Sequence, residues 1–351
     1  MSDKIKLAQG AGGELMDKLI KEKILENFKT ENPNVEIPLS FLDDSAVVDD
    51  IVFTTDSHTV QPIIFPGGDL GSLAVAGTIN DISVMGAKPI ALSAGFIVEE
   101  GLSSETFEII VESMGKTAKN ADVPIVTGDT KVVEKGAIQE FMINTSGIGK
   151  RTSLLDKNIA EVKRYRSFDS RWLLDSNLKK GDKIILSGNI GDHGVALMSF
   201  REGYGFETEI KSDIAPINNL MEKILAIGGI VSAKDPTRGG LANTVNDFSL
   251  KSKVGILLQE EAIPISKGVH SACDMLGIDP LNIGNEGKVV LGVVKEKADE
   301  VLSAIKKHSL GKNAAIIGEA TDKVKGVVIE TTVGGKRNLH KPIGDPVPRI
   351  C

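Results

Sequence analysis

Short apolar strands alternate with amphipathic helices along most of the chain, and this alternation limits the possible folds more than any other feature. Residues 51–58 form an apolar, β-branched strand that ends in a polar cluster. After Ser103 or Ser104, apolar residues recur at helical spacing as far as Ala118, and residues 141–148 form another strand. This order of elements predicts an α/β (α+β) fold.

The length of 351 residues predicts two domains, or one large one, and a core of ample size. We expect a first domain over residues 1–150, a charged connecting segment over 151–179 and a second domain over 180–335. Three prolines among the last ten residues disfavour a helix or a sheet there. Residues 336–351 are therefore predicted to form a mobile tail that begins at the hinge Gly334-Gly335.

The composition excludes several classes of protein. A net charge of −7 leaves no basic face for nucleic acid or an anionic membrane. Two cysteines cannot form a disulfide framework or a cysteine-rich zinc site. No apolar run is long enough to span a membrane, and no apolar stretch follows Met1 as in a signal peptide. These features predict a cytoplasmic protein.

Cys351 ends the predicted tail, which would give a nucleophilic thiol the reach to cross a domain. The alternative is an accidental cysteine in a frayed end, but so few cysteines make that placement improbable by chance. We expect Cys351 to carry a covalently held group. Cys273 lies in a helical stretch and is expected in the core instead.

Acidic residues recur in turns of small residues, several of them directly after strands. One example is the predicted short strand 123–126, which we expect to end in Gly128-Asp129-Thr130-Lys131. Each aspartate alone is commonly a cap or a turn residue, but an oxygen-only set suits Mg²⁺ and nucleotide phosphates. The predicted metal ligands are Asp43, Asp44, Asp56, Asp81, Asp129 and Asp235.

Two glycine-rich features bear on phosphate binding. The loop Gly10-Ala11-Gly12-Gly13 precedes a helix and fits either an anion site or a turn that needs positive φ. The P-loop signature is missing, because Ile110 stands where its first glycine is required before Gly115-Lys116-Thr117. The residues alone therefore indicate an enzyme that uses ATP and Mg²⁺ and carries a thiol arm.

Several motifs resemble the superfamily of aminoimidazole ribonucleotide synthetase, which also contains selenophosphate synthetase and thiamine monophosphate kinase. They are Asp43-Asp44-Ser45-Ala46, Thr55-Asp56-Ser57, Gly77-Thr78-Ile79-Asn80-Asp81 and Gly128-Asp129-Thr130-Lys131. Within it, further motifs resemble the HypE family of hydrogenase maturation proteins. These are Phe65-Pro66-Gly67-Gly68-Asp69, Gly191-Asp192-His193-Gly194, Asp235-Pro236-Thr237-Arg238-Gly239-Gly240 and Pro348-Arg349-Ile350-Cys351. The resemblance covers almost the whole chain, with departures at Gln9 and Lys234.

The resemblance implies two α/β domains, with the N-terminal domains pairing in a homodimer. It also implies the reaction of a carbamoyl dehydratase in [NiFe]-hydrogenase maturation. A HypF-type carbamoyltransferase would load Cys351, and ATP would phosphorylate the amide oxygen. Elimination of phosphate would leave a thiocyanate, whose cyano group passes to iron through a HypC–HypD complex.

We assign site residues on this basis. The catalytic set is Cys351, Glu286, Lys131 and Arg238, with Glu286 as base or orienting group and the two cations on phosphate or transition-state charge. The nucleotide-binding set is Thr55, Asp56, Gly67, Gly68, Thr78, Asn80, Thr130 and Lys131. The alternatives are another ATP-using enzyme of the superfamily, or a nucleotide-binding scaffold without catalysis.

Overall fold

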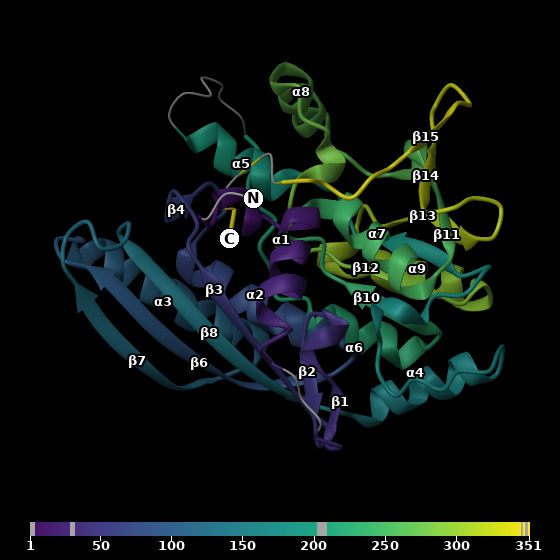
Figure 1. Cartoon of the computed structure of the whole chain (residues 1–351), viewed down its shortest axis with the longest axis horizontal. Helices are drawn as coiled ribbons and strands as arrows, with labels where there is room; N and C mark the ends of the chain where they lie inside the picture. Colours follow the sequence, from purple (N-terminus) through teal and green to yellow (C-terminus); the bar gives the residue numbers. More distant parts are fainter. Residues whose placement is uncertain (1–3, 29–31, 202–208, 345–346, 348–349) are drawn as a thin grey trace.

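Two β-sheets with helices packed on them organise the chain (Figure 1). The computed structural model describes residues 4–28, 32–201, 209–344, 347 and 350–351. The six-stranded sheet has the order β1-β2-β3-β8-β6-β7, and all of its pairs are antiparallel except β6 with β7. Its strands are β1 (Val35–Ile37), β2 (Ala46–Val48), β3 (Ile51–His58), β6 (Lys88–Glu99), β7 (Ile125–Val133) and β8 (Phe141–Lys150).

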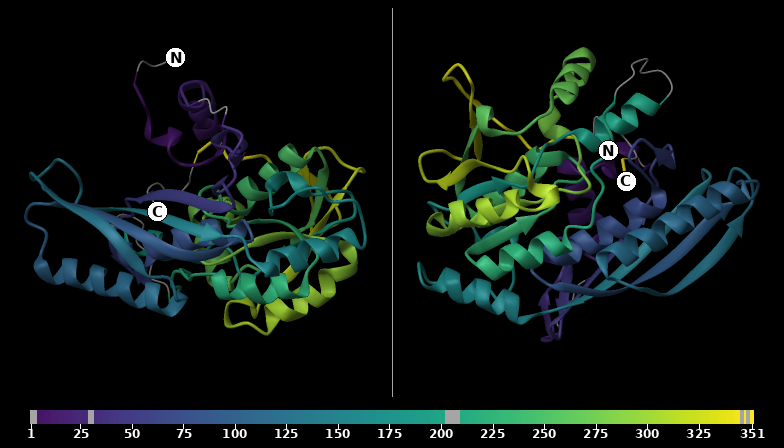
Figure 2. Two further views of the ribbon diagram at one scale, coloured as in Figure 1. Left: turned by 90° about the horizontal axis from the view of Figure 1, so that it is seen from below. Right: turned by 180° about the vertical axis from the view of Figure 1, so that it is seen from behind.

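Two helices, α2 (Leu70–Val84) and α3 (Ser104–Ala121), cover one face of this sheet. We call the opposite face of the six-stranded sheet the open face. Where β6 and β7 form this face, no described helix covers it (Figure 2). Asp69 caps α2 as an acceptor for the amides of Gly71 and Ser72, and a side-chain N-cap of this kind contributes about 1 kcal/mol. Every residue of α2 is buried except Ser72 and Asp81, which makes α2 the central helix of the molecule.

The seven-stranded sheet has the order β10-β12-β9-β13-β11-β14-β15. Its strands are β9 (Lys183–Leu186), β10 (Ile230–Lys234), β11 (Gly255–Gln259), β12 (Val290–Val293), β13 (Ala315–Thr321), β14 (Val327–Glu330) and β15 (Lys336–Asn338). The remaining α-helices are α1 (Gly13–Leu19), α4 (Ser153–Lys163), α5 (Asp192–Phe200), α6 (Asn218–Ile227), α7 (Gly240–Ser252), α8 (Lys267–Leu276) and α9 (Ala298–Lys306). A small sheet pairs β4 (Ile64–Phe65) with β5 (Gly68–Asp69).

The hydrophobic core is continuous between the two sheets. One cluster of buried side chains joins Val52 and Ile82 of the first sheet layer to Trp172 and Ile185 of the second. A boundary of this kind resembles the interior of a domain rather than a hinge.

The segment 151–179 is packed into the molecule despite its charge. It contains α4, whose apolar side chains Leu155, Ile159 and Val162 are buried, and Trp172 is 1% exposed. Charged residues between these apolar positions hide the helical period in the sequence.

The segment 336–351 also differs from the prediction of a mobile tail. Lys336–Asn338 form the edge strand β15 against β14, and Leu339 is buried. The Nζ atom of Lys341 lies 2.7 Å from an Asp17 carboxylate oxygen and 2.6 Å from one of Asp247. The described part of this segment is therefore tied to α1 and α7.

Candidate active site

Three aspartates from separate elements meet at the junction of the two sheets. Asp44 precedes β2, Asp81 lies in α2, and Asp235 directly follows β10. One carboxylate oxygen from each lies within 4.8 Å of the others, so the structure brings together three of the six aspartates that the sequence predicts as metal ligands. We call them the acidic cluster.

Burial and the mutual repulsion of its carboxylates make it costly for the acidic cluster to carry its full negative charge. Burial, followed by the charge of Asp44, raises the pKa of Asp235 to about 8. Burial also raises the pKa of Asp81 well above its usual range, and Asp235 adds to this effect. The Oδ2 atom of Asp235 is buried and has no hydrogen-bond partner among the described residues. An oxygen-only set with an unpartnered buried oxygen fits a hard cation such as Mg²⁺.

Asp43, a predicted metal ligand, points away from the acidic cluster. Its Oδ1 atom accepts a hydrogen bond from the Asp175 amide at 3.2 Å and lies 3.3 Å from Lys251 Nζ. Burial and the charge of Asp175 raise the pKa of Asp43 to about 7. The prediction for Asp43 is therefore wrong in geometry, because the 151–179 segment supplies it with partners that the sequence did not reveal.

Lys234 supplies the nearest positive charge. Its Nζ atom lies 2.5 Å from Asp44 Oδ1 and 3.3 Å from Asp175 Oδ2. The charges of Asp175 and Asp44 outweigh the effect of burial and raise the pKa of Lys234 well above its usual range. Asp44 is thus held in place by a buried ion pair.

Asp56 lies beside the acidic cluster on the α2 side of β3. Side chains alternate along β3, so Val52, Thr54 and Asp56 face α2 while Thr55 faces the open face. Burial raises the pKa of Asp56, but the positive charges of His58 and Arg238 outweigh it and lower the pKa overall. Asp56 is therefore the group here that stays ionised most readily.

Arg238 and Glu286 complete the charged surroundings. The pKa of Arg238 is raised above its usual range, first by the charge of Cys351 and then by those of Asp56 and Glu286. Burial raises the pKa of Glu286 well above its usual range, with Asp235 as the next cause. The Oε1 atom of Glu286 is buried, and no residue in the described part of the chain hydrogen-bonds to it. These groups form one electrostatic unit with the acidic cluster.

Cys351 lies in this site rather than at the end of an extended arm. Its carbonyl oxygen accepts a hydrogen bond from the Thr59 amide at 3.1 Å, directly after β3. Val347 and Ile350 are buried against α5 and the loop at Gly284. Both cysteines are described, and neither is in a disulfide.

The Gly10–Gly13 loop serves as a seat for the same segment. Gly12 and Gly13 have positive φ, and a Cβ atom on Gly13 would lie 2.0 Å from the Pro342 carbonyl oxygen. The Glu14 amide donates to that oxygen at 3.0 Å. The structure bears out the interpretation of this loop as a turn that needs positive φ, and it adds a close approach of another backbone segment.

Asp129, Thr130 and Lys131 are not brought to the acidic cluster. They lie within β7, which extends to Val133, so the prediction of a short strand ending before them is wrong. The β-branched residues on both sides let β7 pair residue by residue with β6. Asp129 is three strand spacings from Ser57, roughly 14 Å, and its side chain is 73% exposed.

Four predicted nucleotide-binding residues have internal roles. The Asn80 amide nitrogen donates to the carbonyls of Ala215 and Glu286, and its oxygen accepts from the Ile217 amide. Thr78 is buried and hydrogen-bonds Thr145. Gly67 and Gly68 lie against the loop at Ser212 and Ile214, where a Cβ atom would clash.

Matches to known families agree with this architecture. The family model for "AIR synthase related protein, N-terminal domain" matches residues 42–150, and the one for the C-terminal domain matches residues 179–330. The chain is 44% identical over 354 residues to carbamoyl dehydratase HypE of Bradyrhizobium diazoefficiens, covering 99% of this chain and 96% of that protein. It is 41% identical to carbamoyl dehydratase HypE of Escherichia coli, with 99% of each chain covered. The chain belongs to the HypE family.

Solved structures of the HypE family have the same fold. A crystal structure of a HypE–HypF complex matches with a TM-score of 0.82 and 44% identity, over 92% of this chain and 99% of that chain. HypE in complex with ATP matches with a TM-score of 0.78 and 39% identity, over 99% and 100%. The predicted two-domain fold related to aminoimidazole ribonucleotide synthetase is thus confirmed.

Three site features escaped the sequence interpretation of this HypE family member. Lys234 had appeared only as a departure from the family pattern, although it pairs with Asp44. His58 and His193 are both fully buried, and burial lowers the pKa of each. His193 lies in the family motif Gly191–Gly194, so the sequence marks this residue without indicating its role.

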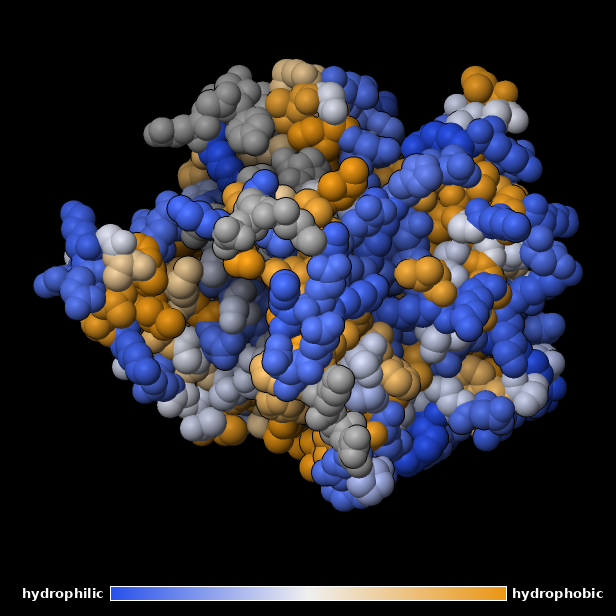
Figure 3. Space-filling view, in the orientation of Figure 1, coloured by the Kyte–Doolittle hydropathy of each residue, from blue (hydrophilic) through white to orange (hydrophobic). Residues whose placement is uncertain are grey.

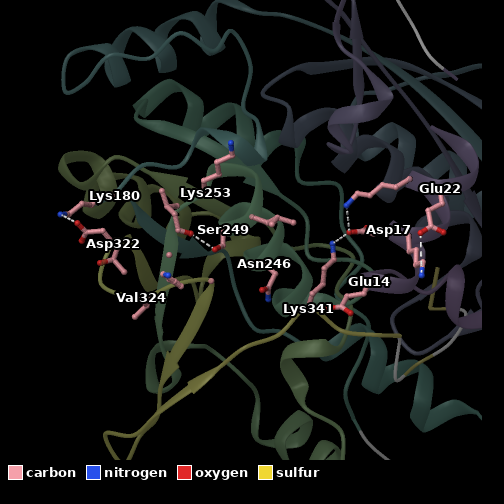
Figure 4. A pocket seen from close by; sticks show the side chains of 18 residues that line it. Glu14, Asp17, Glu22, Lys180, Asn246, Ser249, Lys253, Asp322, Val324 and Lys341 are labelled. Carbon is pink, nitrogen blue, oxygen red and sulfur yellow. Dashed lines mark hydrogen bonds and ion pairs between the residues drawn. The ribbon is translucent and has the colours of Figure 1, made fainter. Parts of the chain in front are cut away.

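A large groove lies outside the site. It is a groove of about 920 Å³ between α1, α7 and the β13–β14 connection, and Lys341 forms part of its wall (Figure 4). Lysines and carboxylates both line it, whereas no member of the acidic cluster does.

None of the helices in the described part of the chain has the length and apolar character of a membrane span.

Proposed function

We propose that this chain is an ATP-dependent carbamoyl dehydratase that acts on a carbamoyl group carried by its own Cys351. The observation that carries the proposal is the hydrogen bond of Cys351 to Thr59, directly after the strand that bears Asp56, where the charge of Cys351 also raises the pKa of Arg238. HypE relatives named carbamoyl dehydratase, and a HypE structure with ATP, support the same reaction.

The reaction balances as a dehydration at one carbon. The oxygen of the thiocarbamate attacks the γ-phosphorus of ATP, and ADP leaves. The C–O bond then breaks, phosphate departs with that oxygen, and the nitrogen loses two protons. The sulfur of Cys351 is left bonded to a nitrile carbon as thiocyanate. A base must therefore lie next to the amide, and positive charge must lie next to the phosphate.

Arg238 and Glu286 have the properties that these roles need. Arg238 is held among negative groups, so its guanidinium stays charged and free to stabilise transferring phosphate. Glu286 is buried with an unpartnered oxygen and a raised pKa, which strengthens it as a proton acceptor. In this proposal Glu286 takes an amide proton, and Asp56 stays anionic to hold Arg238.

Asp44, Asp81 and Asp235 would hold Mg²⁺. Their oxygens are close together, and a buried oxygen of Asp235 has no partner in the protein. Bound there, the ion would neutralise charge on the ATP phosphates. Lys234 fixes the orientation of Asp44 for this purpose.

A homodimer would complete the site. The open face carries exposed apolar side chains, including Phe53 (47%), Ile97 (38%) and Ile148 (38%). Figure 3 shows apolar side chains over this part of the sheet. Burying such a face against a second copy stabilises a dimer. We propose that residues 1–150 form this dimer and that Thr55, Asp129, Thr130 and Lys131 act on nucleotide bound by the second copy.

The other partners follow from the chemistry of the group. A HypF-type carbamoyltransferase would load Cys351, in line with the HypE–HypF complex known for a relative. A HypC–HypD complex would accept the cyano group. A cytoplasmic location fits a thiol that must stay reduced.

Whole-chain mass spectrometry tests the function. Incubation with a HypF-type carbamoyltransferase and its substrates is expected to add about 43 Da at Cys351, and ATP with Mg²⁺ then to remove about 18 Da. The Cys351→Ser variant is the control and should gain neither change. A wild-type chain that never carries the adduct on Cys351 would exclude the proposed function.

A further inference from the structure

His193 makes two buried side-chain hydrogen bonds, one of them to the segment that bears Cys351. It lies in the first turn of α5 and is fully buried. Its Nε2 atom is 2.8 Å from the carbonyl oxygen of Ile350, and its Nδ1 atom is 2.7 Å from Ser212 Oγ. The edge of the Phe65 ring packs on it, with ring centroids 5.6 Å apart.

These partners fix the tautomer of His193. A carbonyl oxygen only accepts, so Nε2 carries the proton and donates it to Ile350. Nδ1 then accepts from the Ser212 hydroxyl, whose oxygen in turn accepts from the Ile214 amide at 3.3 Å. The direction of every bond in this chain is therefore determined. His193 presents a fixed donor to the residue before Cys351.

The loop that orients His193 also positions Glu286. Next to Ser212, the Asp213 carboxylate accepts from the Glu286 amide at 3.0 Å and pairs with Lys288 at 2.9 Å. The Ser212 amide donates to the Pro66 carbonyl at 2.8 Å, which anchors the loop to the first domain. One short loop thus sets the relative positions of Ile350 and Glu286.

We propose that His193 is a positioning residue that docks Cys351 for the reaction by donating from Nε2 to the Ile350 carbonyl. It makes no contact with the reacting atoms. It restrains the backbone one residue away from the sulfur, while Asp213 holds Glu286 on the other side. The link to catalysis rests on the proposed dehydratase function, whereas the docking itself does not.

Two conservative variants separate the hydrogen bond to Ile350 from the packing of the ring. In His193→Gln, the amide nitrogen reaches the position of Nε2 and keeps the donor to Ile350. In His193→Asn, the amide reaches only the position of Nδ1, so the bond to Ser212 stays and the donor to Ile350 is lost. Both variants are neutral and smaller than imidazole, so each is the packing control for the other.

The first readout is alkylation of the unmodified full-length chain by iodoacetamide, followed by peptide mass spectrometry. Loss of one buried hydrogen bond should speed alkylation of Cys351 in His193→Asn about tenfold, with His193→Gln within about twofold of wild type. Cys273, 1% exposed in α8, is the internal control and should react equally in all three chains. Equal rates at Cys351 in both variants, whether raised or not, would overturn the proposal.

The second readout is the ATP-dependent loss of water from carbamoylated chain. This step should slow about tenfold in His193→Asn and recover in His193→Gln, with equal thermal stability of the two variants. Equal rates of this step in the two variants would overturn the catalytic part of the proposal. Alkylation requires neither ATP nor a transferase, so it still tests docking if Cys351 never accepts a carbamoyl group.

Discussion

Two stretches of this chain place an aspartate next to threonine on a strand, and the fold gives them opposite environments. Asp56 on β3 faces α2, and its side chain is 26% exposed beside His58 and Arg238. The side chain of Asp129 on β7 is 73% exposed. Lys131 Nζ lies 3.9 Å from Asp129 Oδ2, and the Lys131 side chain is 71% exposed. Asp56 belongs to a buried charged site, whereas Asp129 and Lys131 lie on a surface.

The difference comes from strand parity and position in the sheet. β3 is an inner strand, and its even-numbered residues Val52 to His58 face α2. β7 is the edge strand, and most of its residues are exposed. Residue type alone therefore does not create an active site. Burial against a helix and a second sheet shifts the pKa of a carboxylate. On an edge strand a carboxylate stays exposed unless a partner chain covers it.

The largest expected effect concerns the buried region. Glu286→Gln should reduce phosphate release from ATP by the carbamoylated chain by about 10²- to 10⁴-fold, the usual contribution of a general base. A phosphate-release assay measures this, with Glu134→Gln, just beyond β7, as the matched exposed control. Turnover close to wild type in Glu286→Gln would remove Glu286 from the mechanism.

The same substitution at two lysines tests the energetic contrast. Lys234→Met leaves the Asp44 carboxylate buried without its cation, while Asp175 keeps Lys251 at 2.7 Å, and this should lower the free energy of unfolding by about 3–5 kcal/mol. Lys131→Met removes an exposed charge and should leave stability unchanged within the error of a urea titration. Similar urea midpoints for both variants would show that the two regions do not differ as described.

Mixed dimers test whether the exposed region serves the partner's site. Lys131→Ala alone should lower turnover roughly 10- to 100-fold. When it is mixed and re-associated with Glu286→Gln, half of the dimers are mixed and each has one intact site if Lys131 acts across the dimer. Activity should then recover to about a quarter of wild type. No recovery above the residual activity of Lys131→Ala would mean that Lys131 and Glu286 act within one chain, and wild-type turnover in Lys131→Ala alone would mean that Lys131 is not involved.

The last test is the pH dependence of stability that Asp235 causes. Its pKa is about 8 when folded against a reference value of 3.8, so the folded chain holds this proton more tightly. This contribution to stability is fully present below pH 3.8 and is lost as pH rises through 8. Without Mg²⁺, Asp235→Asn should gain on wild type by at most about 1.4 kcal/mol per pH unit between pH 4 and 8, and no further above it.

Thermal melts in EDTA over this range give the measurement. Added Mg²⁺ should stabilise wild type and leave Asp235→Asn unaffected, because the ion needs the carboxylate. Parallel melting curves for the two chains at all pH values would contradict the raised pKa of Asp235.

Local patterns predicted the elements whose partners are close in sequence. The strand at residues 51–58, the Asp69 cap and the helix after Ser103 all appear in the structure. Of the six aspartates that the sequence grouped, the structure brings together Asp44, Asp81 and Asp235. The roles assigned to these residues stay predictions.

What the sequence could not provide depends on contacts between distant segments. Asp43 and Asp44 are adjacent, yet Asp43 turns to Lys251 and Asp175 while Asp44 joins the acidic cluster. The 336–351 segment has the composition of a loose arm, yet Lys341 and Leu339 anchor it. Neither outcome leaves a local trace, because the partners lie dozens to hundreds of residues away.

Asn80 has a consequence for how reactants reach the site. Its amide fastens α2 to the backbone of residues 215, 217 and 286, within a core that continues from one sheet to the other. Parting the two lobes would break three buried hydrogen bonds and open that core, so clamshell opening is not available to this enzyme. On the proposed function, the two sheets keep their relative positions and the substrate moves instead. The C-terminal segment carries Cys351 into the site and leaves it with the thiocyanate attached.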